Sequence, residues 1–314
     1  MKELRNIFSW SYSAAMDFEE CRRRHYWKKY GKWGGWNRDA DPTARKAYQL
    51  DKMENCFTLT GHAAEQAVEW LLAEAQSGRD HGAEEAWEHI ARPFLRRAWK
   101  ESRDGEWRRA PKKYCCLREH YYGTLEDEKS RAAEMKEQIL RCLAHFLDRT
   151  LPRLRDIRPE DRIEVAVPGA GGDAEHFVFN GIKVYAIPDY AWREADRIHI
   201  IDWKAGRMKA EHARQVGVYG LWAREKHATP PEQVTVYVEY LNEGRVAVDQ
   251  LTPERLDEVV AYMSRTVGEM TEYLVDADRE RNIPVPRDEW ELASDPRICG
   301  RCNFYELCRE ELER

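Results

Sequence analysis

The clearest pattern of apolar and polar positions lies between residues 182 and 203. Residues 184–189 alternate between apolar and more polar side chains, and residues 197–203 form a second run rich in β-branched residues. Alternation with a period of two is typical of a strand with one buried face. We therefore predict a β-hairpin whose first strand ends at Asp189 and whose second strand carries Asp202.

Further strands are predicted on both sides of this hairpin. Residues 162–168 alternate as a strand, and the short strand HFVFN follows a glycine-rich loop. Residues 234–241 and 245–251 predict two more strands, joined by the tight turn Asn242-Glu243-Gly244. The pattern in the second half of the chain thus predicts a β-sheet.

Helical periodicity dominates most of the remaining sequence. The predicted helices are residues 11–30 with Ser11 or Ser13 as N-cap, residues 63–72 after a break at Thr60-Gly61, residues 132–151, a helix after Gly206, and residues 253–275 opened by Thr252-Pro253-Glu254. Residues 74–155 are polar, mixed in charge and helical in pattern. The chain therefore combines helices and strands, with a long helical stretch ahead of the main sheet.

Length and charge narrow the classes of protein. A chain of 314 residues is long enough for one large domain or two ordinary ones. Its net charge of −6, its 34% of charged residues and the lack of a long apolar run argue against a membrane protein. The first 21 residues lack the apolar segment of a signal peptide, so we expect the cytoplasm. The acidic balance does not favour nucleic acid, although a basic lining confined to a groove is compatible with it.

The predicted hairpin brings candidate chemistry together. Two facing carboxylates, Asp189 and Asp202, repel each other unless they share a proton or bind a divalent cation. Lys204 lies on the same side of the strand as Asp202, because side chains repeat with a period of two. A metal and an ammonium group at one point suit water activation and charge stabilisation on a phosphate. Gln215 and Tyr219 are an i, i+4 pair on the next helix and can border this site.

In this order and spacing, Pro188-Asp189, Asp202-Trp203-Lys204 and Gln215-Val-Gly-Val-Tyr219 resemble the PD-(D/E)XK nuclease superfamily. The final Gln-x-x-x-Tyr resembles its RecB-like branch. The resemblance implies an α/β fold, with a restriction-endonuclease-like mixed central sheet flanked by helices. It also implies Mg²⁺ or Mn²⁺ held by Asp189, Asp202 and the Trp203 carbonyl. The alternative is that both acids merely end strands and pair with nearby arginines.

One more metal ligand is expected on the helix after Gly61. The RecB-like pattern places a histidine four residues after a glycine, and Glu65 occupies that position here. A carboxylate is a better ligand than imidazole for Mg²⁺, so Glu65 is our choice. His62, one turn earlier, is the alternative, and either residue can instead belong to the helix surface.

Four of the eight cysteines form a second constellation. Cys21 lies near the start of the chain, and Cys299, Cys302 and Cys308 follow a C-x2-C-x5-C spacing near its end. Thiolates at this density bind zinc or an iron–sulfur cluster. The layout resembles the iron–sulfur subset of RecB-like nucleases, which includes AddB-type and CRISPR-associated exonucleases, and this implies a structural 4Fe-4S cluster. Zinc and unligated buried thiols are the alternatives.

These motifs divide the chain into four parts. We predict N-terminal entry helices with one cluster ligand at 1–73, a helical insertion at 74–155, the nuclease core at 156–280 and the cluster segment at 281–314. Between residues 22 and 36, basic and aromatic residues interleave, which favours either a strand-binding surface or an amphipathic helix with a buried aromatic face.

The combined expectation is a metal-dependent deoxyribonuclease with Asp189, Asp202, Lys204, Gln215 and Tyr219 at its centre. By resemblance it is an exonuclease acting on single-stranded DNA ends, and a helicase or another complex subunit is a partner compatible with this branch. The alternatives are a catalytically silent subunit that binds DNA ends or serves as a scaffold, and a zinc-stapled RNA-binding protein.

Overall fold

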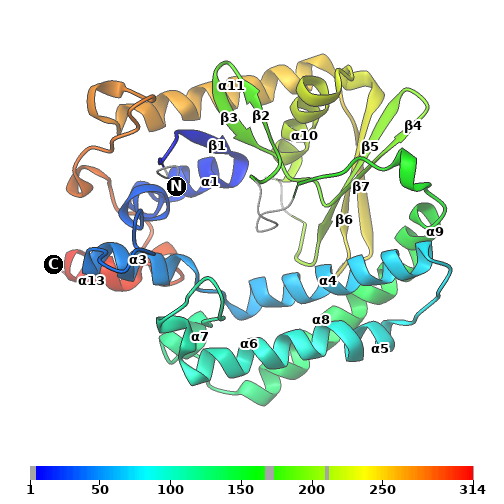
Figure 1. Cartoon of the computed structure of the whole chain (residues 1–314), viewed down its shortest axis with the longest axis horizontal. Coiled ribbons are helices and arrows are strands. Elements are labelled where there is room, and N and C mark those ends of the chain that lie inside the picture. Colours follow the sequence, from blue (N-terminus) through cyan, green and yellow to red (C-terminus); the bar gives the residue numbers. More distant parts are fainter. Residues whose placement is uncertain (1–4, 167–172, 209–211, 314) are drawn as a thin grey trace.

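A four-stranded mixed sheet carries Asp202, and Asp189 directly precedes its first strand. The computed structural model describes residues 5–166, 173–208 and 212–313. Within them the sheet has the order β4-β5-β6-β7, with β5 and β6 parallel and the two outer pairs antiparallel (Figure 1). The strands are β4 (Tyr190–Glu194), β5 (Arg197–Lys204), β6 (Val234–Tyr240) and β7 (Arg245–Gln250).

The central strand β5 is covered on both faces. Ile198 and Ile200 face a core shared with α10 (His212–His227) and α11 (Pro253–Glu272). Ile201 and Trp203 face a second core built with α4 (Cys56–Gln76) and α8 (Glu128–His145). A strand buried on both sides needs an almost continuous apolar run, as in this strand. The parallel step from β5 to β6 passes through α10, which brings this helix beside the acids.

A second, three-stranded sheet precedes the first. It has the order β1-β3-β2 and consists of β1 (Ser9–Ser11), β2 (His176–Phe179) and β3 (Ile182–Tyr185). Asn180 and Gly181 turn the β2–β3 hairpin with φ values of 48° and 74°, the left-handed backbone that this turn requires. The mixed α/β class is therefore as predicted, but two hydrogen-bonded sheets share the core in place of one central sheet.

The predicted limits of the first hairpin strand are wrong. β3 ends at Tyr185 and belongs to the three-stranded sheet, whereas the partner of β5 is β4. Asp189 lies just before β4 and does not end a strand. The chain changes sheets between 186 and 189, and an alternating sequence cannot reveal such a crossing because both sheets bury one face.

Two other local predictions also fail. The break at Thr60-Gly61 is absent, because α4 starts at Cys56 with Asn55 as its N-cap and continues through both residues. Within the described part of residues 162–168, Arg162 forms only an isolated bridge to Trp192 and no strand follows. Residues 167–168 lie outside the described residues.

Helices make up most of the remaining structure. The N-terminal ones are α1 (Tyr12–Glu20), α2 (Arg22–Tyr26), a π-helical turn (Trp27–Gly31) and α3 (Pro42–Asp51). With α4 and α8, the helical layer contains α5 (Ala83–Ala86), α6 (Arg92–Asp104), α7 (Arg118–Tyr121), α9 (Leu151–Leu154) and π-helical turns at Trp87–Ala91 and Phe146–Thr150. The short 3₁₀ turns are Glu106–Arg108, Pro159–Asp161, Pro231–Gln233, Val275–Ala277 and Arg287–Glu289.

The N-terminal and the C-terminal helices lie side by side (Figure 1). α12 (Pro296–Cys299) and α13 (Tyr305–Leu312) lie close to α2 and α3. Arg23, 3% exposed, forms an ion pair with Glu311 at 2.8 Å and donates to the Trp290 carbonyl at 2.8 Å. A buried guanidinium with two partners joins the ends firmly.

The basic and aromatic segment at 22–36 is mainly structural. Trp27 is 1% exposed and packs in a core with Phe304, and Arg23 is committed to the C-terminal contact. In this segment the rings of Trp33 and Trp36 are partly open to solvent, at 37% and 39% exposed. This segment is therefore better described as an amphipathic helix with a buried aromatic face than as a strand-binding surface.

No helix within the described residues combines the length and the apolar character needed to cross a bilayer.

Candidate active site

Asp202 is the centre of a buried polar network. It is 2% exposed and lies on the central strand β5. Tyr219 donates its hydroxyl to Asp202 Oδ1 at 2.6 Å, and Gln215 Nε2 donates to the same oxygen at 3.3 Å. Gln215 Nε2 also lies 2.8 Å from the Tyr219 hydroxyl. The i, i+4 pair on α10 therefore faces the acid, as the spacing predicts.

Asp189 and Lys204 complete the group from the same sheet. The β4–β5 register pairs Tyr190 with Ile201, so the next step places Asp189 opposite Asp202. Asp189 Oδ2 accepts the Trp203 backbone N–H at 2.6 Å. Lys204 Nζ lies 2.6 Å from Asp202 Oδ2. The two carboxylates and the ammonium group thus lie together at one end of the hairpin.

The electrostatics follow from burial and from the acid pair. Burial raises the pKa of Asp189 well above its usual value, and the charge of Asp202 raises it further. Burial opposes the charged form of Lys204, yet Asp202 and Asp189 keep its pKa above the ordinary value. Burial and the charge of Asp202 also raise the pKa of Tyr219, so this hydroxyl stays protonated and donates. Two negative charges this close are thus disfavoured with the ammonium group of Lys204 alone to balance them.

Glu65 approaches this group from α4. It lines a cavity of about 270 Å³ together with Lys204 and Trp203. Its charge adds to the rise that burial and Asp202 cause in the pKa of Asp189, and it supports the raised pKa of Lys204 less strongly than Asp202 and Asp189 do. His62 lines the same cavity, but its Nδ1 lies 3.6 Å from Glu54 and its side chain is half exposed. Glu65 is therefore the better placed of the two candidates to reach the acids.

The cavity also contains residues that the sequence reasoning missed. Phe57, on the first turn of α4, is 64% exposed beside the site. Gln138 of α8 donates to the Ala205 carbonyl at 2.9 Å, and the His212 ring stacks on Tyr240 with centroids 5.5 Å apart. Arg207 lines this cavity as well. No spacing signal marks these residues, because they come from three helices, α4, α8 and α10, and from the loop after β5.

The acids fit a hard divalent cation by their chemistry. Asp202 Oδ2 is buried and has no hydrogen-bond partner besides its ion pair with Lys204. Carboxylate oxygens are the ligands that Mg²⁺ and Mn²⁺ prefer. In the ranges that the structure describes, no group of three or more His, Cys, Asp or Glu side chains is already arranged so that it could hold a metal ion.

The four predicted cluster ligands line one small cavity. Cys21, Cys299, Cys302 and Cys308 surround it, next to Arg24 and Trp27. Backbone N–H groups of Arg24 and Phe304 lie 3.3 and 3.4 Å from the sulfur atoms of Cys21 and Cys302. Trp27 Nε1 is buried beside the Cys308 sulfur, where its N–H opposes the rise in the pKa of that thiol. These donors suit sulfur atoms that carry negative charge.

The raised pKa values of these cysteine thiols are consistent with a site that needs a cation to hold thiolates. Burial raises the pKa of Cys302 to about 12, and burial with the nearby Cys21 sulfur raises the pKa of Cys299. Burial likewise raises the pKa of Cys308. Four thiolates would repel one another here, and a bound metal centre would remove that penalty. The other four cysteines, Cys56, Cys115, Cys116 and Cys142, do not line this cavity.

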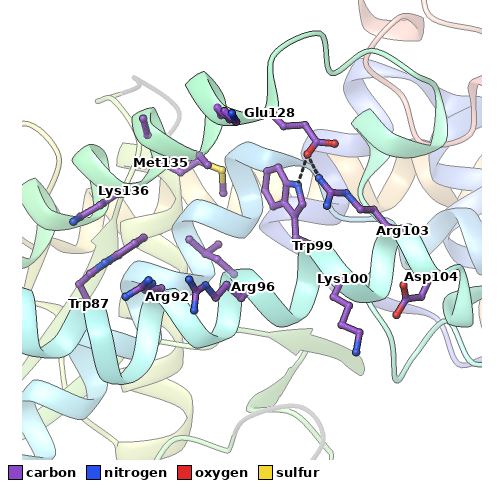
Figure 2. Close-up of a pocket in the computed structure, with 14 residues that line it drawn as sticks. Trp87, Arg92, Arg96, Trp99, Lys100, Arg103, Asp104, Glu128, Met135 and Lys136 are labelled. Carbon is purple, nitrogen blue, oxygen red and sulfur yellow. Dashed lines mark hydrogen bonds and ion pairs between the residues drawn. The ribbon is translucent and has the colours of Figure 1, made fainter.

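A larger cavity, of about 680 Å³, lies between α6 and α8 and is shown in Figure 2. None of the predicted site residues lines it. Trp99 donates to Glu128 at 3.4 Å, and Lys136 covers the Trp87 ring with its Nζ 5.5 Å from the centroid. Lys136 therefore covers one of the two tryptophan rings of this groove, and Glu128 holds the other by its edge.

Two comparisons with known proteins bear on this arrangement. Residues 9–309 match the family model described as the PD-(D/E)XK nuclease superfamily. No curated protein matches the chain significantly.

Proposed function

This chain belongs to the PD-(D/E)XK nuclease superfamily, and on that premise we propose that it hydrolyses DNA phosphodiester bonds at the Asp189–Asp202 pair with Mg²⁺ or Mn²⁺. The observation that carries the proposal is the convergence on Asp202. Tyr219 and Gln215 bind its Oδ1, whereas Oδ2 contacts Lys204, a residue that lines the cavity. A charge held this firmly, beside a second acid, is expected of a metal ligand.

Each residue has a role in the proposed reaction. Asp189, Asp202, Glu65 and the Trp203 carbonyl would hold the cation, which, when bound, lowers the pKa of an attacking water. Lys204 would donate to that water or to a phosphate oxygen and stabilise the developing charge. Gln215 and Tyr219 would keep Oδ1 occupied, so that Oδ2 stays directed at the cation. Their hydrogen bonds to Asp202 support this positioning role.

Within the superfamily, the proposal extends to the branch to which the chain belongs and to the form of DNA that it cleaves. We place the chain in the RecB-like branch because its Gln215 and Tyr219 both contact the acid. We propose exonuclease action on single-stranded ends, since the cavity of about 270 Å³ between α4 and the end of β5 suits one strand better than a duplex. Residues 1–73, 74–155, 156–280 and 281–314 would form the entry helices, insertion, core and cluster segment.

The second proposed centre is a structural 4Fe-4S cluster. The four cysteines would bind it, because they share one cavity although almost the whole chain separates Cys21 from the other three. The buried N–H of Trp27 would then donate to a cluster sulfur. Zinc is the other metal that four thiolates suit. Iron and zinc analysis of protein purified without oxygen distinguishes the two.

The experiment that tests the function follows end-labelled DNA. Single and double strands are incubated with the protein and Mg²⁺, Mn²⁺ or EDTA. We expect stepwise shortening of the single strand with either metal and none with EDTA. If DNA binds but stays intact under every condition, the protein is instead a DNA-end-binding or scaffold subunit.

A further inference from the structure

The outer strand of the four-stranded sheet is unusually open. β7 is exposed along most of its length, and Val246 and Val248 are 38% and 61% exposed. The opposite edge is different, because the Ile163 N–H donates to the Ala191 carbonyl of β4 at 2.9 Å. Proteins normally cover or charge a long apolar edge, since its free main-chain groups pair readily with another strand.

The free main-chain groups of β7 can be identified. Leu251 donates to the Val234 carbonyl at 3.2 Å, and the register continues from there without interruption. In an antiparallel ladder alternate residues face the partner strand. Residues 245, 247 and 249 therefore point their N–H and C=O groups toward β6. Those of Val246 and Val248 point away from the sheet.

We propose that β7 pairs antiparallel with β7 of a second copy of this chain, about a two-fold axis at Ala247. In this register Val246 faces the partner's Val248, and Val248 faces the partner's Val246. Each of these two pairs exchanges two main-chain hydrogen bonds. Ala247 meets the partner's Ala247 on the axis, where the strands approach closely and a methyl group fits. Two four-stranded sheets become one continuous sheet of both chains.

Charge selects this register over its neighbours. Centred on Ala247, Arg245 faces the partner's Asp249 twice across the axis. Centring on Val246 would instead place Glu243 opposite the partner's Asp249, and centring on Val248 would pair no opposite charges. Arg245 makes no ion pair among the described residues, and Asp249 has only a 4.0 Å contact with Arg255. Both charges are thus available to a partner.

The proposed contact leaves the candidate active site open. β6 separates β7 from the strand of Asp202, and no β7 residue lines the cavity of Glu65 and Lys204. Six residues per chain is a small contact beside the ~20–30 residues of a standard interface. We therefore expect a weak dimer, with a dissociation constant on the order of 10–100 μM.

The first test is sedimentation velocity of the full chain over a range of concentrations. We expect the mean mass to rise from monomer to dimer, and Val248→Lys to abolish the rise by placing a charge in the new sheet. The matched control is Val178→Lys, at a valine 63% exposed on the edge strand β2, which should leave association unchanged. A wild-type chain that stays monomeric well above ~100 μM, or a dimer indifferent to Val248→Lys, overturns the proposal.

The second test uses the charges. Arg245→Asp and Asp249→Arg should each be monomeric, because like charges then meet twice across the axis. An equimolar mixture of the two variants should form a heterodimer, and the double variant should dimerise again. Circular dichroism checks that each variant is folded, since Asp249 also lies near Arg255. A mixture that stays monomeric while wild type dimerises contradicts this register.

Discussion

Asp202 is held through both of its oxygens, which makes its charge easy to remove without moving its neighbours. Asp202→Asn keeps a side chain of the same shape, and its carbonyl can still accept from Tyr219 and Gln215. We expect nuclease turnover to fall at least about 100-fold with little change in folding, because a ligand and its charge are lost. Asp196→Asn, in the turn of the same hairpin, is the control and should remain active. Wild-type turnover in Asp202→Asn would exclude the assigned site.

Glu65 and His62 line the same cavity but have different neighbours, so their substitutions should have different effects. Glu65→Gln should raise the metal concentration needed for half-maximal activity by about tenfold or more, because a charged ligand becomes neutral. His62→Gln should leave the titration unchanged, since its ring is turned to Glu54. Metal titrations of both variants decide the matter. The reverse pattern would assign the ligand to His62.

The pKa of Asp189 predicts how metal and pH act together. Its pKa is raised in the folded chain, so the folded state retains a proton that the unfolded state loses. Without metal, stability should therefore fall as pH rises from the ordinary aspartate pKa of about 3.9 toward the raised value, by at most about 1.4 kcal/mol per pH unit. Mg²⁺ competes with this proton, so the rise in Tm that it causes should grow with pH.

The control for this experiment is Asp189→Asn. The variant cannot titrate at this position, so the part of the pH dependence due to Asp189 should disappear from its thermal unfolding. An equal rise in Tm with Mg²⁺ at every pH, in wild type and variant alike, would show that the cation binds elsewhere.

At the scale of elements, close helix packing holds α10 in place. A methyl group added at Gly217 would lie 2.2 Å from Val259 Cγ2 on α11. Gly217→Ala should therefore cost about 1–3 kcal/mol of unfolding free energy and weaken activity, because Gln215 and Tyr219 move with the helix. Adding Val259→Ala should recover part of the activity by removing the clash.

Gly268 on α11 provides the matched control. It is exposed in the interior of a helix, and an added methyl group would meet no atom within 4 Å. Gly268→Ala should therefore stabilise the chain by about 0.5–1 kcal/mol and leave activity unchanged. Denaturant unfolding of the two alanine variants gives the comparison. Equal effects at both positions would mean that backbone propensity, and not the contact between the helices, controls stability here.

At the scale of the whole molecule, the four-cysteine cavity joins the two ends of the chain. If it holds an iron–sulfur cluster, protein purified without oxygen should be brown from thiolate-to-iron charge transfer. Cys21→Ala should lose the colour and become sensitive to protease at both ends, because metal binding energy is also folding energy. Cys142→Ala, in the core of the helical layer, should keep its colour. If the protein is colourless and contains one zinc per chain, the cavity binds zinc and not an iron–sulfur cluster. The assignment of the acid site would not change.

Local sequence patterns by themselves determine much of this protein. The strands β5, β6 and β7, the cap of α11 at Thr252 and the relation between Gln215 and Tyr219 all follow from short-range spacing. The shared face of Asp202 and Lys204 follows in the same way, because a strand fixes which side chains lie on one side. Such features involve residues a few positions apart, where backbone geometry decides the outcome.

Tertiary structure decides what depends on distant partners. Alternation around Val184 is compatible with either sheet, and only packing assigns it to β3 and leaves Asp189 just before β4. Gly61 continues α4 because the helix buries its apolar face against α8, which outweighs a local preference for a break. The composition around Arg23 fits a strand-binding surface as well as an amphipathic helix. Because Arg23 is buried against Glu311, this residue serves the packing of the chain. Propensity acts over a few residues, whereas burial depends on chain segments hundreds of positions away.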